Sequence, residues 1–559
     1  MCKSMFAISG KVVNVFDGEV RRETVYIKDE RVFAVGDYSI KVDKVFDLSD
    51  YYLLPGFIDA HIHIESSMLT PTEFAKYALL HGTTCLVLEP HEIANVCGIK
   101  GIEFMLSSKA PFRFFFTAPS CVPATTMETS AFQIGVDEVK SLLKHPKCVG
   151  LGELMNYVGV IQNDPKVIEK IKAAKELHKV CDGHAPQLRG LDLCKYVGAG
   201  IQSDHECVNI KEASEKLKLG MYIMIREGSA AKNLESLIDL AKGTGGDRCM
   251  FVSDDIHVSE LIEDGHLDRI LRKAVSLGLD PIRSIKMVTI NPARYFGLEG
   301  LGAIAPNHFA DIVAVKDLKR FEVKAVFVNG TLVVDDGKLI YEFEHSSIPN
   351  EVLSTIRVRD FSIEDLKVRS GRRRDVRVIR VEANEIVTKG EVATLDAKDG
   401  FLIPDIDNDI LPLIVFERHK MSGNIGKGFV SGFGLKSGAL ASTVAHDSHN
   451  IVCVGADYED IGEAVKELRR VGGGLIAVNG GKVMAELKLP IAGLMSDESG
   501  EYVKEKLEDL HEAARSLGCK LPSPFMTLSF LSLPVIPELK LTDKGLVDVN
   551  RFDFVEVLL

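Results

Sequence analysis

The chain of 559 residues has an ordinary globular composition, with 46% hydrophobic and 26% charged residues, which excludes wholesale disorder and a fibrous repeat. Its 80 acidic residues outnumber the 67 Lys and Arg residues and give a net charge of −13, so a protein that coats nucleic acid or an anionic membrane is not expected. The sequence has eleven cysteines without CxxC spacing, no membrane-length apolar run and no N-terminal export signal. We therefore expect a cytoplasmic protein with reduced thiols.

Two β-rich segments flank a long central segment. Residues 1–55 contain β-branched and aromatic runs separated by turn residues, and residues 300–345 show the same pattern. Within the second segment, Asn329-Gly330 between apolar runs is typical of a hairpin turn. We predict that residues 1–55 and 300–345 pair into one small composite β-sandwich, with the central segment inserted between them.

The central segment, residues 56–299, alternates short apolar strands with amphipathic helices. Eight strands are predicted, at residues 56–64, 83–90, 112–119, 148–154, 180–185, 199–206, 219–227 and 248–255. Eight strands with intervening helices over about 245 residues are typical of a (β/α)₈ barrel, and an open doubly wound sheet is the alternative. Polar residues end nearly every strand, where the active sites of barrels lie, and this favours the barrel.

The rest of the chain divides into a polar segment and a second folded region. Residues 346–375 end in a basic run, which we interpret as a solvated linker, because the chain is acidic overall and the run lacks interleaved aromatic residues. Residues 376–559 are predicted to form a C-terminal α/β domain. Its glycine-rich stretch lacks the spacing of a phosphate loop, so we expect turns there rather than a nucleotide site.

Histidines and acids at the strand ends indicate a metal site. His61 and His63 are two positions apart in the first predicted strand of the barrel, so both imidazoles face the same way and can bind a divalent ion. Polar residues that end later strands complete the candidate set, namely Glu153, His184, His205 and Asp254. Each of them alone could be a capping residue. Together, four histidines and two carboxylates suit Zn(II), Mn(II) or Fe(II) and are enough for two ions bridged by Glu153.

These strand ends resemble the amidohydrolase superfamily of metal-dependent hydrolases, which are built on a distorted (β/α)₈ barrel. Within that superfamily the chain is most similar to the bacterial and archaeal adenine deaminases. The segments that carry this similarity include PGFIDAHIHIESSMLTP, EPHEIANVCG, GELMNYVGV, DGHAPQLRG, SDHECV, MIREGSAAKNL, SDDIH and GLKSGALASTVAHDSHNIVCVG. The resemblance spans nearly the whole chain.

The resemblance implies a role for each candidate ligand. His61 and His63 would bind the buried metal, the acid of strand four, Glu153, would bridge, and strands five and six would contribute one histidine each. Asp254 would be both ligand and proton shuttle. Two departures stand out. The bridging group is Glu153 rather than a carboxylated lysine, and Glu89 stands where the shorter Asp is expected.

The implied reaction is the hydrolysis of adenine to hypoxanthine and ammonia, in purine salvage. Asp254 would move the proton of the attacking water, and Glu92 or Glu227 could donate or accept a proton at a ring nitrogen. Further candidate substrate contacts are Glu89, His91, Arg226, Ser253 and Asp255, for which an ion pair or cap at a strand end is the alternative. Asp255 also competes with Asp254 for the shuttle, because neighbours on a strand point in opposite directions.

His446 and His449 form a second histidine cluster in the C-terminal region. Either they are exposed residues before a turn, or this domain closes over the barrel mouth and excludes water. Rival functions are another cyclic amidohydrolase, dihydroorotase-like or imidazolonepropionase-like, and a barrel scaffold without catalysis. The expected partners are a small-molecule purine and further copies of the chain, in a homodimer or larger assembly.

Overall fold

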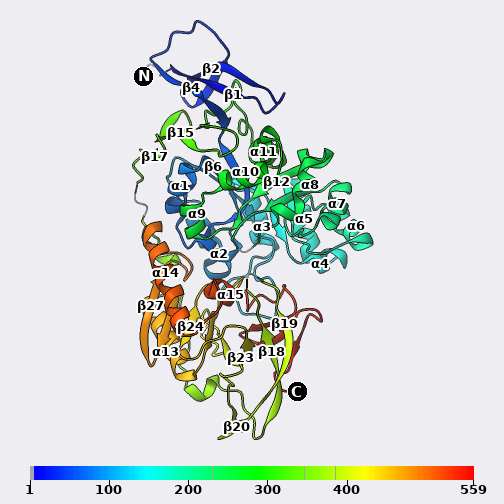
Figure 1. Cartoon of the computed structure of the whole chain (residues 1–559). Helices are drawn as coiled ribbons and strands as arrows, with labels where there is room; N and C mark the ends of the chain where they lie inside the picture. Colours follow the sequence, from blue (N-terminus) through cyan, green and yellow to red (C-terminus); the bar gives the residue numbers. More distant parts are fainter. Residues whose placement is uncertain (1–4, 230, 345–346, 384) are drawn as a thin grey trace.

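The computed structural model describes residues 5–229, 231–344, 347–383 and 385–559. Figure 1 shows three parts in a row, with a β-sheet at one end, a barrel in the middle and the C-terminal domain at the other end. Residues 1–4, at the start of the first predicted β-rich segment, lie outside the described residues. So do residues 345 and 346, where the second β-rich segment was predicted to meet the linker.

Strands from both flanks of the central segment form one curled sheet. They are β1 (Met5–Val13), β2 (Val20–Lys28), β3 (Arg31–Val35), β4 (Lys44–Pro55), β14 (Ile312–Val315), β15 (Val323–Val328), β16 (Thr331–Asp335) and β17 (Lys338–Leu339). Their order is β17-β16-β15-β14-β4-β1-β2-β3. The antiparallel pairing of β14 with β4, with Ile312 opposite Pro55, joins the two flanks. The flanks thus pair as the sequence indicates, but in a single hydrogen-bonded sheet with one apolar cluster on its inner face.

The central segment folds into parallel strands in two sheets, of order β13-β5-β6-β7-β8-β9 and β10-β11-β12. The strands are β5 (Phe57–His63), β6 (Thr83–Leu88), β7 (Arg113–Ala118), β8 (Cys148–Leu154), β9 (Val180–Gly183), β10 (Ser203–Asp204), β11 (Tyr222–Arg226), β12 (Cys249–Val252) and β13 (Asp254–Asp255). The two sheets meet where the Gln202 N–H donates to the Cys181 carbonyl at 2.9 Å. The central segment is therefore a distorted barrel, as predicted, and not an open doubly wound sheet.

Helices on the outside of the barrel cover the strands (Figure 1). They are α1 (Pro71–Leu80), α2 (His91–Met105), α3 (Val136–Leu143), α4 (Tyr157–Ile161), α5 (Pro165–Glu176), α6 (Gly190–Ala199), α7 (Ile210–Lys218), α8 (Leu234–Lys242), α9 (Val258–Glu263), α10 (Leu267–Ser276), α11 (Pro281–Met287) and α12 (Ile290–Phe296). Because helices cover the outer face and side chains fill the interior, strands such as β6 are buried throughout and read as continuous apolar runs.

Ser253 joins the last strand of the barrel to the first. Its hydroxyl donates to the Asp59 carboxylate at 2.5 Å, and its backbone N–H donates to the same group. His266 lies against that carboxylate, with Nε2 at 3.1 Å. The next residue, Asp254, has φ of 58°, a left-handed conformation that is uncommon outside glycine. The chain thus changes direction between β12 and β13, and Asp254 pairs with β5 opposite Ile62.

The C-terminal domain is built on a mainly antiparallel sheet of order β19-β18-β23-β22-β25-β24-β26-β27. Its strands are β18 (Arg374–Arg380), β19 (Lys389–Leu395), β22 (Leu411–Phe416), β23 (Ile425–Ser431), β24 (Ala439–Ser442), β25 (Ile451–Gly455), β26 (Gly474–Asn479) and β27 (Lys482–Lys488). The helices are α13 (Tyr458–Val471), α14 (Gly500–Ser516) and α15 (Pro524–Ser529). Two small sheets complete it, β20 (Ala397–Lys398) with β21 (Phe401–Leu402), and β28 (Leu539–Thr542), β29 (Gly545–Asp548) and β30 (Asp553–Val555).

The predicted linker, residues 346–375, packs against the C-terminal domain over much of its described length. Val352, Val358 and Leu366 are buried in its apolar clusters, which the polar composition of the segment conceals. Among the described residues, no helix combines the length and hydropathy needed to cross a membrane. The ten described cysteines are all free thiols.

Asp311 connects the flanking sheet to Arg113 of the barrel strand β7, and this contact provides a stability test. Its carboxylate accepts from Arg113 Nε at 2.8 Å and from the Asn329 backbone N–H at 2.7 Å. We expect Asp311→Ala to destabilise the protein by about 3 kcal/mol, because it leaves a mostly buried guanidinium without its carboxylate partner. Denaturant unfolding measures this. Lys109→Ala, which removes an exposed pair with Glu344, is the control, and equal unfolding midpoints for the two variants would contradict the prediction.

Candidate metal centre and active site

The six predicted metal ligands converge at the C-terminal ends of the barrel strands. His61 and His63 lie in β5 and Glu153 lies in β8; His184 and His205 follow β9 and β10; and Asp254 begins β13. The Nε2 atoms of His61 and His63 are 3.4 and 3.3 Å from Asp254 Oδ1. Side chains from five strand ends therefore meet in one buried cup.

Glu153 lies between two pairs of histidines. One carboxylate oxygen, Oε1, is 4.0 Å from His61 Nε2 and 3.6 Å from His63 Nε2. The other, Oε2, is 2.7 Å from His184 Nδ1 and 3.1 Å from His205 Nε2. Each oxygen thus faces one pair, which is the geometry that a carboxylate needs to bridge two ions.

The donor atoms in the cup fit a divalent metal. His61 Nε2 and His91 Nδ1 are buried without a hydrogen-bond partner in the described structure, which is costly unless a ligand satisfies them. Triads such as His61, His63 and Glu153 place their donor atoms within 4.8 Å of one another. Mixed imidazole and carboxylate sets suit first-row divalent ions. Every atom needed for coordination is thus present and turned inward.

The acids and histidines of the cup shift one another's pKa and so favour their charged forms. Burial alone would raise the pKa of Glu153, but His205 and His184 hold it well below its usual range. Burial alone would lower the pKa of His63, but Asp254 and Asp255 raise it well above the ordinary value. The cup is therefore a set of mutually compensating charges.

Arg226 and Asp254 form a pair at the edge of the cup. Arg226 Nη1 donates to Asp254 Oδ2 at 3.3 Å and to Glu206 Oε1 at 2.5 Å. Asp255, by contrast, accepts from the Ser66 hydroxyl and lines the cavity beside the cup. The geometry thus turns Asp254, and not Asp255, toward the histidines. Sequence reasoning missed Glu206, although it directly follows His205.

Two of the candidate substrate contacts are engaged elsewhere. Glu227 accepts from the backbone N–H of Leu234 and pairs with Lys273 Nζ at 2.5 Å. Ser253 is held by Asp59, as described above. Both side chains are tied to their neighbours in the barrel wall, and Glu227 does not join the histidine cluster.

Glu89 reaches the cup because residue 152 has no side chain. A Cβ at Gly152 would lie 2.2 Å from Glu89 Oε2. The Glu89 carboxylate accepts from the Thr117 hydroxyl, and its Oε1 is 3.6 Å from His91 Nδ1. His91 Nδ1 is in turn 3.3 Å from Glu153 Oε1. The longer side chain at position 89 is thus accommodated by glycine on β8, two strands away from β6 in the sheet.

Glu92 connects the barrel to the C-terminal domain. It lies in the first turn of α2, and its two carboxylate oxygens contact His446 Nδ1, at 2.6 Å, and His449 Nε2. Both histidines are buried. The reading of them as exposed residues before a turn is therefore wrong, and the C-terminal domain does close over this side of the barrel mouth.

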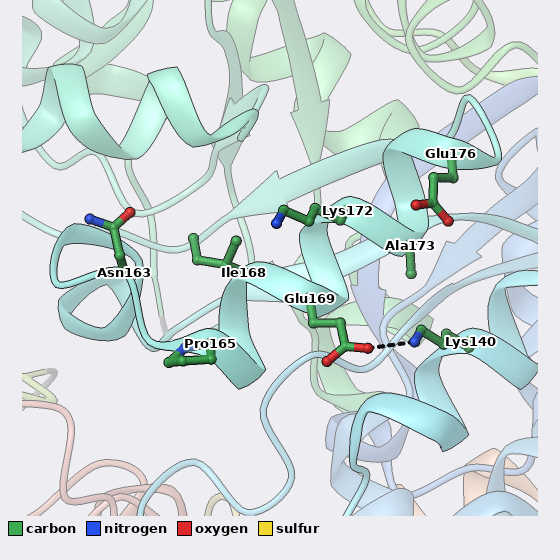
Figure 2. Close-up of a pocket in the computed structure, with 8 residues that line it drawn as sticks. All are labelled: Lys140, Asn163, Pro165, Ile168, Glu169, Lys172, Ala173 and Glu176. Carbon is green, nitrogen blue, oxygen red and sulfur yellow. Dashed lines mark hydrogen bonds and ion pairs between the residues drawn. The ribbon is translucent and has the colours of Figure 1, made fainter.

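A cavity lies between the barrel and the C-terminal domain next to Glu92. Its lining residues are Ser66, Met68, Asp255, His257, Val444, His446, Leu475, Leu507, His511, Phe525, Met526, Ser529 and Phe530. Just over half are apolar, and the polar ones come from both the barrel and the C-terminal domain. A second hollow, between α3 and α5, lies on the outer helices and is crossed by the Lys140–Glu169 ion pair (Figure 2). None of the predicted site residues lines that second hollow.

Comparison with known proteins agrees with this architecture. Residues 52–333 match the amidohydrolase family and residues 385–553 match the adenine deaminase C-terminal domain. An adenine deaminase of Dehalococcoides mccartyi is 47% identical over 98% of this chain and 95% of its own length. One of Methanothermobacter thermautotrophicus is 47% identical over 98% of each chain. The chain belongs to the adenine deaminase family. Among solved structures, a β-aspartyl dipeptidase of Fervidobacterium islandicum covers 60% of this chain and 99% of its own, with 17% identity and a TM-score of 0.47.

Gly152 provides a direct test of the Glu89 geometry. Gly152→Ala should displace the Glu89 carboxylate and, through His91, the neighbouring face of the metal cup. We expect the metal content per chain and kcat each to fall at least tenfold, because the displaced residues no longer orient the metal ligands. Gly198→Ala, which places a Cβ in open space on α6, is the control. Normal metal content in the Gly152→Ala protein, measured by elemental analysis, would refute this account of Glu89.

Proposed function

We propose that the protein is an adenine deaminase, which hydrolyses adenine to hypoxanthine and ammonia with a divalent metal pair in the cup. One observation carries the proposal: Glu153 lies between two histidine pairs inside a chain whose nearly full-length relatives are adenine deaminases. His61, His63 and Asp254 would hold one ion, His184 and His205 the other, and Glu153 both. When bound, the metals supply the Lewis acidity that activates water.

Asp254 is the proton carrier in this proposal. Its Oδ1 faces His61 and His63, while Arg226 holds Oδ2. Burial alone would raise the pKa of Asp254, but the two histidines and Arg226 keep it well below its usual range. The group is therefore an anion that can accept the proton of the attacking water and return it to the departing amine.

The proposal extends to finer points. Mn(II) or Fe(II) is the expected metal, with Zn(II) as an alternative, because availability decides among ions of similar affinity. We also propose that the protein is a cytoplasmic enzyme of purine salvage. It would assemble as a homodimer or larger homo-oligomer, because most soluble oligomers are closed assemblies of identical chains. Light scattering on the purified protein tests the assembly.

Ammonia release from adenine is the decisive measurement. The protein should be purified without oxygen and reconstituted separately with Mn(II) and Fe(II). We expect ammonia and hypoxanthine in equal amounts, and no turnover of dihydroorotate or imidazolonepropionate, which the rival cyclic amidohydrolases would use. Turnover of either of those compounds without adenine turnover would overturn the proposal.

Asp254→Asn tests the proton carrier. The amide keeps the size of the side chain but is too weak a base to accept the proton of the attacking water. We expect kcat to fall by about 10²–10⁴, while most of the metal remains bound. Asp264→Asn, at an exposed position on the surface, should leave kcat unchanged. A loss of less than about fivefold in the Asp254→Asn protein would remove Asp254 from the mechanism.

A further inference from the structure

The contact between Glu92 and the C-terminal domain indicates which of Glu92, His446 and His449 carries a proton. Both Glu92 oxygens are engaged by histidine nitrogens, and the carboxylate is buried. Burial alone would raise the pKa of Glu92, but His446, His449 and His91 hold it well below its usual range. Glu92 is therefore an anion that accepts two hydrogen bonds, and it carries no proton to give to a substrate.

The protonation of His449 follows from its other ring nitrogen. The Ala445 backbone N–H donates to His449 Nδ1 at 3.0 Å, so Nδ1 carries a lone pair. His449 Nε2 must then carry the proton that it shares with Glu92. Burial also lowers the pKa of His449. His449 is consequently a neutral donor of fixed orientation, further held by Arg418 Nε, which donates to its carbonyl.

His446 is the member of the cluster that holds a transferable proton. Burial alone would lower the pKa of His446, but the Glu92 carboxylate raises it to about 9. Nδ1 donates to Glu92, and among the described residues none hydrogen-bonds the other ring nitrogen, Nε2. The imidazole stacks on Phe530 with ring centroids 4.5 Å apart and lines the cavity beside Asp255 and Ser66.

Hydrogen bonds hold this cluster together. His446 Nδ1 is 2.6 Å from Glu92 Oε1, and His449 Nε2 contacts Oε2. The arrangement is that of an oriented acid: a carboxylate fixes one ring nitrogen of a histidine, and the imidazole lines a cavity.

We propose that His446 is the general acid that protonates N1 of the purine ring as water adds to C6, and that Glu92 and His449 are positioning residues that orient it. This inference rests on the adenine deaminase function proposed above. It assigns a catalytic group to the C-terminal domain and moves the ring-protonation step from Glu92 to its partner.

The proton balance of the reaction is complete with these groups. As the C6–O bond forms, one proton of water passes to Asp254, and His446 Nε2 gives its proton to N1. When the C6–N bond breaks, Asp254 delivers its proton to the departing amine, which leaves as ammonia. The remaining proton of the added hydroxyl is lost as the C6 carbonyl forms, and it restores His446. Hypoxanthine keeps the proton at N1.

The test compares two substitutions at His446 in the metal-loaded enzyme. His446→Asn keeps a donor for Glu92 but has no proton to transfer, so we expect kcat to fall by about 10²–10⁴, with KM within about threefold and metal content unchanged. His446→Gly should lose a similar factor and regain at least tenfold in kcat when imidazole is added. His178→Asn, an exposed loop residue, is the control.

The outcomes separate this inference from the function on which it rests. If the wild-type enzyme releases no ammonia from adenine, the proposed function fails. If the wild type is active and His446→Asn retains kcat within threefold, His446 is not the acid. Loss of activity in His446→Gly without rescue by imidazole, together with a raised KM and reduced metal content, would likewise overturn the inference, because it would show a structural role.

The positioning role of His449 has its own readout. His449→Gln retains a donor that can reach Glu92, whereas His449→Ala does not. We expect the Gln variant to keep kcat within about fivefold and the Ala variant to lose at least 30-fold at unchanged metal content. Equal losses in both variants would contradict orientation through this hydrogen bond.

Discussion

The active site depends on one buried carboxylate, that of Glu153. Removing a charge from water costs several kcal/mol unless opposite charge and hydrogen-bond donors surround it. Here the compensation comes from histidines on three other strand ends, each of which is itself buried or nearly so. The barrel supplies these donors because its parallel strands all end on one face. The cup therefore assembles only when the strands are in register.

The C-terminal domain is part of the same electrostatic unit. Glu92 lies on the barrel, but the donors that hold both of its oxygens come from residues more than 350 positions later in the sequence. Without that domain, the first turn of α2 would expose an anion directly beside His91 and the metal cup. Both parts lie in one chain, and this contact gives a physical reason: the barrel mouth is chemically incomplete on its own.

The sequence predicted the parts of the site that follow from strand geometry. His61 and His63 share a face because strands have a period of two, and Glu153, His184 and His205 follow apolar runs whose C-terminal ends must meet in a barrel. The choice between Asp254 and Asp255 could not be made in this way, since it depends on a left-handed backbone at one residue. The partners of Glu92 were equally out of reach, because no local pattern connects α2 with a turn in another domain.

The three acids of the site use their two oxygens in the same manner. Glu153 divides its oxygens between two histidine pairs, Asp254 between histidines and Arg226, and Glu92 between His446 and His449. A carboxylate can do this because both oxygens accept and share the negative charge, whereas an amide presents one acceptor and one donor. Each acid thereby joins two groups that would otherwise be uncompensated. The consequence is that charge, and not only shape, holds the metal cup, the proton carrier and the C-terminal domain in one arrangement.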